Sequence, residues 1–98
     1  MRVISQDGAI DMPYEMSIVW RDDNGAVLLQ PIGETGEYQT FAKYSTEEKA
    51  KKAMEELRYA YMCHSLVKMG KSPLDGIDKK ITMGLSGVFQ FPAEEELE

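Results

Sequence analysis

Cys63 and His64 are neighbours in this sequence, and their side chains could form a nucleophile and a general base. They lie in a long stretch with helical spacing, where consecutive side chains point about 100° apart, so they cannot hydrogen-bond to each other within one chain. His64 belongs to the apolar stripe of that stretch, and a partly buried histidine bonded to a backbone carbonyl is the simpler interpretation. With one cysteine and one histidine, a metal site would depend on carboxylates, and no pair of them has a recognisable ligand spacing. We therefore predict no catalytic residue, no metal site and no cofactor.

Two polar loops resemble pieces of ligand-binding motifs. Gly70 to Ser72 matches the end of a phosphate-binding loop, but that motif needs a glycine five residues before Gly70, where this chain has Ser65. Asp22 to Gly25 resembles part of a calcium loop, but the first and twelfth ligands would then be Trp20 and Pro31, whose side chains cannot bind calcium. We interpret the first loop as a helix end with a polar connection and the second as a hairpin turn.

The aromatic side chains are the better candidates for a contact with another protein. Tyr14 and Trp20 alternate onto one face of an expected strand, Tyr44 ends another strand, and Tyr59 lies on the polar face of the expected helix. Each could be a core residue or part of a contact patch. The seven methionines likewise fit either a core or an adaptable binding surface.

The charge balance restricts the partners. The 98 residues include 17 acidic and 11 basic ones, giving a net charge of −6, which argues against direct binding to nucleic acid. A single cysteine cannot form an internal disulfide, and no apolar run approaches the roughly 20 residues that span a bilayer. The first residues have no apolar signal-peptide core. These features predict a cytoplasmic protein that does not bind membranes.

Alternating patterns and turn residues predict the strands that position these side chains. We expect strands over 2–5, 14–20, 26–30 and 37–44. The first two intervals contain the turn signals Asp-Gly and Asn-Gly, and the third contains Pro31 and the turn 34–36. Weaker patterns over 77–83 and 88–91 could be further short strands.

The best-defined element is a helix from Thr46 to Met69, with Gly70 as its stop. Ser45 and Glu48 have the spacing of a capping box, and Glu47 precedes Lys51 in the favourable order for an ion pair. The fold class that follows is α+β, with an antiparallel β-meander of about four strands packed by one long α-helix. We expect one domain over residues 1–92 and a flexible acidic tail over 93–98.

Three segments together resemble a known group of proteins. They are Arg2-Val3-Ile4-Ser5-Gln6-Asp7-Gly8 with the following Asp11-Met12-Pro13-Tyr14-Glu15, then residues 44–58, and Phe89-Gln90-Phe91-Pro92-Ala93. The group consists of small proteins of low-GC Gram-positive bacteria and their prophages, and no established activity is known to us for it. The resemblance implies a cytoplasmic accessory protein linked to a mobile element, and it assigns no functional residues.

The leading hypothesis is a non-enzymatic protein-binding accessory module, whose partner could be a second copy in a homodimer, because a meander leaves edge strands open to pairing. The alternative is an inhibitor of a nucleic-acid enzyme that uses its acidic groups as phosphate mimics, and high salt should weaken only that kind of binding. An enzyme would need acidic pairs such as Asp22 and Asp23 to gather in a pocket, which their spacing does not predict.

Overall fold

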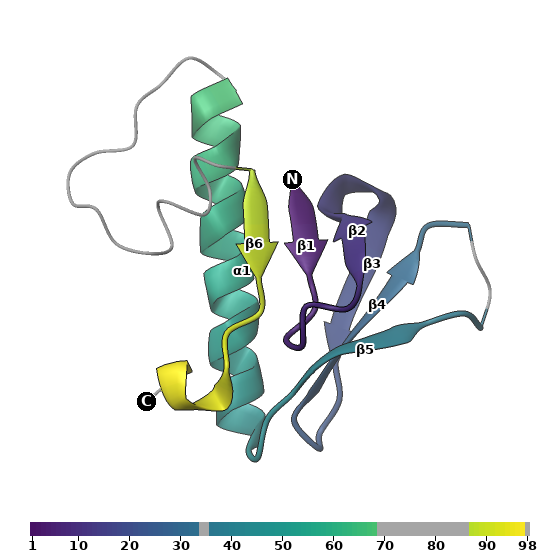
Figure 1. Ribbon diagram of the computed structural model, residues 1–98, viewed down its shortest axis with the longest axis vertical. Coiled ribbons are helices and arrows are strands. Elements are labelled where there is room, and N and C mark those ends of the chain that lie inside the picture. Colours follow the sequence, from purple (N-terminus) through teal and green to yellow (C-terminus); the bar gives the residue numbers. More distant parts are fainter. Residues whose placement is uncertain (34–35, 69–86, 98) are drawn as a thin grey trace.

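The computed structural model describes residues 1–33, 36–68 and 87–97 (Figure 1). The expected strand over 77–83, the stop at Gly70 and the loop from Gly70 to Ser72 lie outside the described residues. The described part is an α+β fold with one long helix and two three-stranded sheets, which confirms the expected fold class.

The first sheet has the strand order β2-β1-β6, and it lies beside the helix. Its strands are β1 (Arg2–Ile4), β2 (Asp11–Pro13) and β6 (Val88–Gln90). β1 runs antiparallel to β2 and parallel to β6, so this sheet joins the two ends of the chain. The sequence patterns did not predict β2.

The second sheet is the expected antiparallel meander, and it extends away from the helix (Figure 1). Its strands are β3 (Ser17–Arg21), β4 (Ala26–Pro31) and β5 (Gln39–Lys43). Gln6, in the turn after β1, links the two sheets. Its backbone amide donates to the Phe41 carbonyl (2.7 Å), and its side-chain oxygen accepts from the Lys43 amide (3.0 Å).

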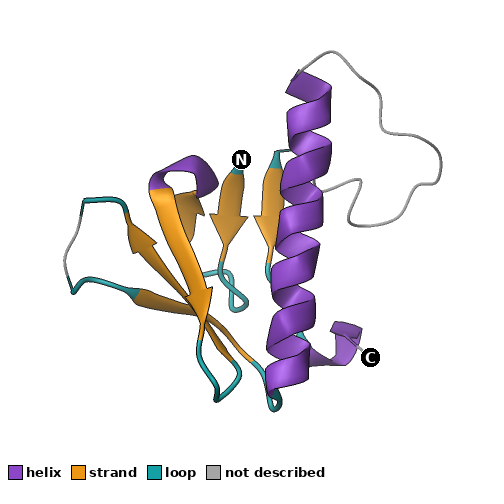
Figure 2. Ribbon diagram, turned by 180° about the vertical axis from the view of Figure 1, so that it is seen from behind, coloured by secondary structure: helices purple, strands orange, loops and turns teal. Residues whose placement is uncertain are grey.

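Helix α1 (Glu47–Lys68) packs its apolar stripe against the first sheet and the inner face of the second (Figure 2). Alanine, leucine, glutamate and lysine predominate in it, and all are good helix formers. Its buried side chains are those of Ala50, Ala53, Met54, Leu57, Ala60 and Cys63. All of them except Cys63 belong to one core with aromatic and branched residues from β1, β4, β5 and β6.

The predicted strand over 14–20 is wrong at its beginning. Tyr14–Met16 form a 3₁₀ turn, η1, and the strand begins only at Ser17. The Tyr14 amide donates to the Met1 carbonyl (2.8 Å) at the end of the first sheet, and the Ser17 amide closes the turn on the Tyr14 carbonyl. The chain changes direction here because it must pass from one sheet to the other.

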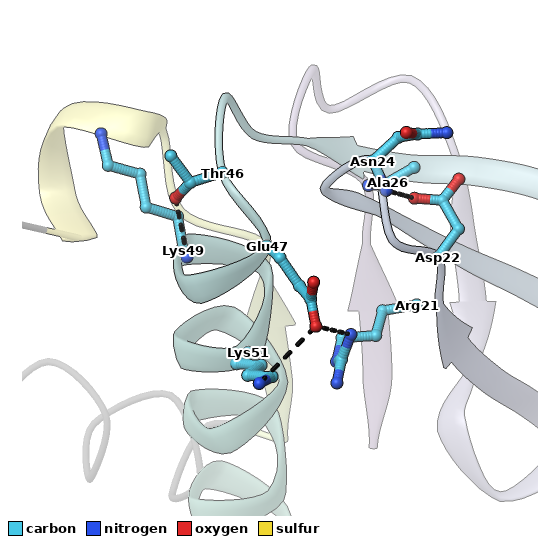
Figure 3. Close-up of polar contacts among 8 residues, drawn as sticks. All are labelled: Arg21, Asp22, Asn24, Ala26, Thr46, Glu47, Lys49 and Lys51. Atoms are coloured by element: carbon cyan, nitrogen blue, oxygen red, sulfur yellow. Dashed lines mark hydrogen bonds and ion pairs between the residues drawn. The ribbon is translucent and has the colours of Figure 1, made fainter.

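The helix cap lies one residue later than the predicted capping box. The Lys49 amide donates to the Thr46 hydroxyl oxygen (3.2 Å), so Thr46 is the capping residue (Figure 3). The Ser45 amide instead donates to the Glu94 carboxylate. The predicted ion pair of Glu47 with Lys51 is confirmed at 3.6 Å, and the same carboxylate oxygen accepts from Arg21 Nη1 at 3.1 Å (Figure 3). These contacts fix the start of α1 against the end of β3.

Thr46→Ala should lower the free energy of unfolding by about 1 kcal/mol, because it leaves the Lys49 amide without its side-chain acceptor. Thr46→Ser is the matched control, because it keeps the hydroxyl oxygen that accepts from the Lys49 amide. Urea unfolding followed by circular dichroism would measure both changes. Equal losses for the two variants would show that the Thr46 hydroxyl does not cap the helix.

The segment expected as a flexible acidic tail is folded in the structure. Glu94–Leu97 form a short 3₁₀ helix, η2, and the Leu97 side chain is only 4% exposed within the core. Glu94 forms an ion pair with Lys49 at 3.9 Å, and Lys52 donates to the Leu97 carbonyl at 3.3 Å. One buried leucine among the acidic residues and two lysines on α1 hold this segment against the helix.

Candidate protein-binding surface

The four aromatic candidates do not form one patch. Tyr44 is only 2% exposed, and its hydroxyl donates to the Pro92 carbonyl (2.8 Å). Burial, with smaller contributions from Glu56 and Glu96, raises the pKa of this phenol far above its ordinary value. Tyr44 is therefore a core residue, and its assignment as a contact residue is corrected.

The other three lie on different parts of the surface. Tyr14 packs its ring against that of Tyr61 on α1, with centroids 4.6 Å apart. Trp20 contacts the Tyr38 ring (5.7 Å) on the outer face of the second sheet. Tyr59, 37% exposed, lies on the face of α1 that points away from the core.

The outer face of the second sheet is apolar where β3 pairs with β4. Ile18 is 50% exposed and Tyr38 is 55% exposed, and the ring of Trp20 lies with them. Leu28, opposite Trp20 in the strand register, is buried beneath this group. Ile18 and Tyr38 were missed as candidates, although Ile18 shares a strand face with Trp20 in the sequence pattern.

The backbone of β3 offers a second feature, which follows from its pairing with β4. The Asp22 amide donates to the Ala26 carbonyl (3.0 Å) at one end of the ladder, and the Ile32 amide donates to the Met16 carbonyl (2.9 Å) at the other. In an antiparallel pair, bonded and non-bonded residues alternate. Residues 16, 18, 20 and 22 of this strand are therefore the ones that bond to β4.

The amides and carbonyls of Ser17, Val19 and Arg21 consequently point away from β4. The Ser17 amide is used by η1. Among the described residues, no strand pairs with the remaining outward-facing amides and carbonyls, because β3 is the edge of its sheet. Val19, in the middle of β3, thus presents both a donor and an acceptor at an open edge.

The other sheet edges in the described part of the chain are protected. β2 and β6 have three residues each, and β2 ends in Pro13, which cannot donate to a new strand. Gln6 occupies the edge of β5 through its two hydrogen bonds. β3 has five residues and neither proline nor lysine, the residues that usually discourage pairing at an edge.

A groove of about 420 Å³ runs between this open edge and helix α1. Ser17 and Val19 line its strand side, and Tyr14 and Glu15 line one end. Its helix side is formed by Met54, Leu57, Arg58 and Tyr61. The arrangement is an edge strand and a helix with a depression of mixed polar and apolar lining between them.

The Cys63 thiol and the Asp22 carboxylate, which were considered for catalysis or metal binding, are both part of the folded framework. Cys63 is buried, and among the described residues no group of three or more metal-ligating side chains comes together. The Asp22 carboxylate accepts from the amides of Ala26 and Asn24, both at 2.9 Å, and the Ala26 bond is the main reason why its pKa lies below its ordinary value (Figure 3). This confirms the hairpin-turn interpretation of that loop.

Comparison with protein-family models, with curated proteins and with solved structures found no match for this chain. Among the helices of the described residues, none combines the length and the apolar character that a membrane span requires. The functional proposal therefore depends on the geometry of the surface itself.

Proposed function

We propose that this protein is a non-enzymatic binding module that pairs with a segment of another protein along the open edge of β3. The observation that carries this proposal is the position of Val19, whose amide and carbonyl face outward beside a groove of mixed polar and apolar lining. Edge strands of this kind accept an additional strand, in which main-chain hydrogen bonds supply affinity and neighbouring pockets supply specificity.

The adjoining apolar surface supports the same proposal. A strand added at β3 would place alternate side chains over the groove and over the outer face, next to Ile18 and Trp20. Covering these half-exposed groups removes apolar area from water, which is the main favourable contribution in most protein associations.

Phosphate mimicry, the alternative, has less support from the positions of the acidic groups. In the C-terminal segment, Glu94 is engaged by the Ser45 amide and Lys49, and Glu96 accepts from the Ala93 amide. In the hairpin turn, one Asp22 oxygen accepts two backbone amides. These carboxylates serve the fold and are not arranged as a row facing solvent.

Val19→Pro should reduce partner capture at least tenfold in a pull-down from lysate of the source cell, because proline removes the outward amide hydrogen without touching the ladder to β4. Val19→Ala is the matched control, since it removes more of the side chain but keeps the donor. The yield of the captured protein would be measured by mass spectrometry at two salt concentrations.

A partner retained at high salt by the wild type and Val19→Ala, but lost with Val19→Pro, is the expected result. A nucleic-acid enzyme captured only at low salt, and equally by all three proteins, would replace this proposal with phosphate mimicry. Thermal unfolding of each variant would show that the binding-deficient protein remains folded.

A further inference from the structure

The groove beside β3 has the form that a single extended segment requires. One wall is the β3 edge, where the Val19 amide and carbonyl have no backbone partner among the described residues, and the opposite wall is the side of α1 that carries Met54, Leu57 and Arg58. A strand added to β3 would lie about 4.8 Å from it in the plane of the sheet, and its inward side chains would lie on the same side as the groove.

The side chains that face the groove define which residues such a segment should carry. Ser17 and Val19 point to the groove side of β3, whereas Ile18 and Trp20 point to the outer face. Every second side chain of an added strand would enter the groove. There it would meet chiefly the partly exposed rings of Tyr14 and Tyr61, which favour an apolar side chain.

The two charged residues that line the groove, Glu15 and Arg58, differ in their contacts with the described residues. The Glu15 carboxylate accepts from the Met1 amino group at 2.8 Å through both oxygens. Arg58 is exposed and lines the groove, and it has no hydrogen bond or ion pair with any described residue. The groove therefore offers a cation whose charge is complementary to a carboxylate, and a guanidinium binds a carboxylate through two parallel hydrogen bonds.

We infer that the groove between β3 and α1 binds an extended peptide segment of a partner protein that carries an apolar residue and an aspartate or glutamate on the same strand face. The apolar side chain packs on the rings of Tyr14 and Tyr61, the carboxylate pairs with Arg58, and the backbone bonds to Val19. This inference rests on the proposed function and adds the chemistry of the partner to it.

The test is selection from a displayed library of random linear peptides on the immobilised full chain, followed by affinity measurement of the enriched peptides by fluorescence anisotropy. We expect enriched sequences with an acidic residue two positions from an apolar one. Arg58→Glu should weaken these peptides about tenfold or more, because it replaces the attraction by repulsion. Arg58→Lys is the matched control, because it keeps the positive charge at the same position and should weaken the peptides far less than Arg58→Glu.

The outcomes separate this inference from the proposed function. Peptides that depend on Val19 but show no acidic preference, and bind Arg58→Glu unchanged, would overturn the inference and leave the binding module intact. If no peptide is enriched while the pull-down still yields a Val19-dependent partner, or a concentration-dependent dimer appears on analytical ultracentrifugation, the groove binds a folded surface or a second copy, and the inference is wrong. Failure of both the selection and the pull-down would overturn the inference and the proposed function together.

Discussion

Phe91→Ala is expected to lower the free energy of unfolding by about 3–5 kcal/mol, because it leaves a cavity where three parts of the chain meet. The Phe91 side chain is 1% exposed, and its ring contacts those of Phe41 on β5 (6.4 Å) and Phe89 on β6 (5.3 Å) in edge arrangements. A domain of this size has a total stability of about 5–15 kcal/mol, so the variant would lose a large share of it. Urea unfolding followed by tryptophan fluorescence and circular dichroism would measure the change.

Two controls make the result specific to this position. Phe91→Leu keeps most of the apolar volume and should cost about 1 kcal/mol. Met62→Ala, at a half-exposed position on α1, should leave the unfolding midpoint nearly unchanged. If Phe91→Ala were as mild as Met62→Ala, the C-terminal segment would not contribute to the core as the structure places it.

The elements that depend on neighbouring residues were predictable from the sequence. The helix is specified by its own composition and spacing, and the structure bounds it at Glu47 and Lys68, close to the expected ends. The β3–β4 hairpin follows from Asn24 and Gly25, and these residues do form the turn. Local geometry decides both, so no knowledge of distant contacts was needed.

The division into two sheets was not predictable, because it depends on pairs far apart in the chain. Arg2 pairs with Val88 in parallel, and nothing in two strands of three residues indicates that they will meet. Gln6, an ordinary turn residue in the sequence, blocks the edge of β5 only because the first sheet brings it there.

The candidate site was partly predictable. An open edge strand could be expected of any meander, but its position at β3 follows from the protection of the other edges by distant residues. Aromatic residue type alone did not identify the contact surface. Tyr44 is a core residue, because its hydroxyl donates to the Pro92 carbonyl, 48 residues away in the chain. In the sequence, Arg58 cannot be distinguished from the other charged residues of the helix, because its position in the groove depends on how α1 packs beside β3.

Gly25→Ala is the other substitution for which we expect a large loss of stability, about 2–4 kcal/mol. Gly25 has a φ of +88°, a conformation that costs a side-chain-bearing residue about 1 kcal/mol or more. An added Cβ would also overlap the carbonyl oxygen of Tyr44, whose amide donates to the Gly25 carbonyl at 2.9 Å. Backbone atoms cannot move aside as a flexible side chain can, so this overlap adds a further 1–3 kcal/mol or so.

Gly33→Ala separates the two contributions, because Gly33 has a similar φ of +94° but no atom within 4 Å of an added Cβ. It should cost about 1 kcal/mol, and the difference between the two variants, measured by urea unfolding, is then the cost of the overlap with Tyr44. Equal losses would mean that the turn at Gly25 does not approach the Tyr44 backbone. The junction that places the start of α1 beside the end of β3 would then need to be revised, because Tyr44 lies two residues before the helix cap. The open edge of β3 depends on the same hairpin.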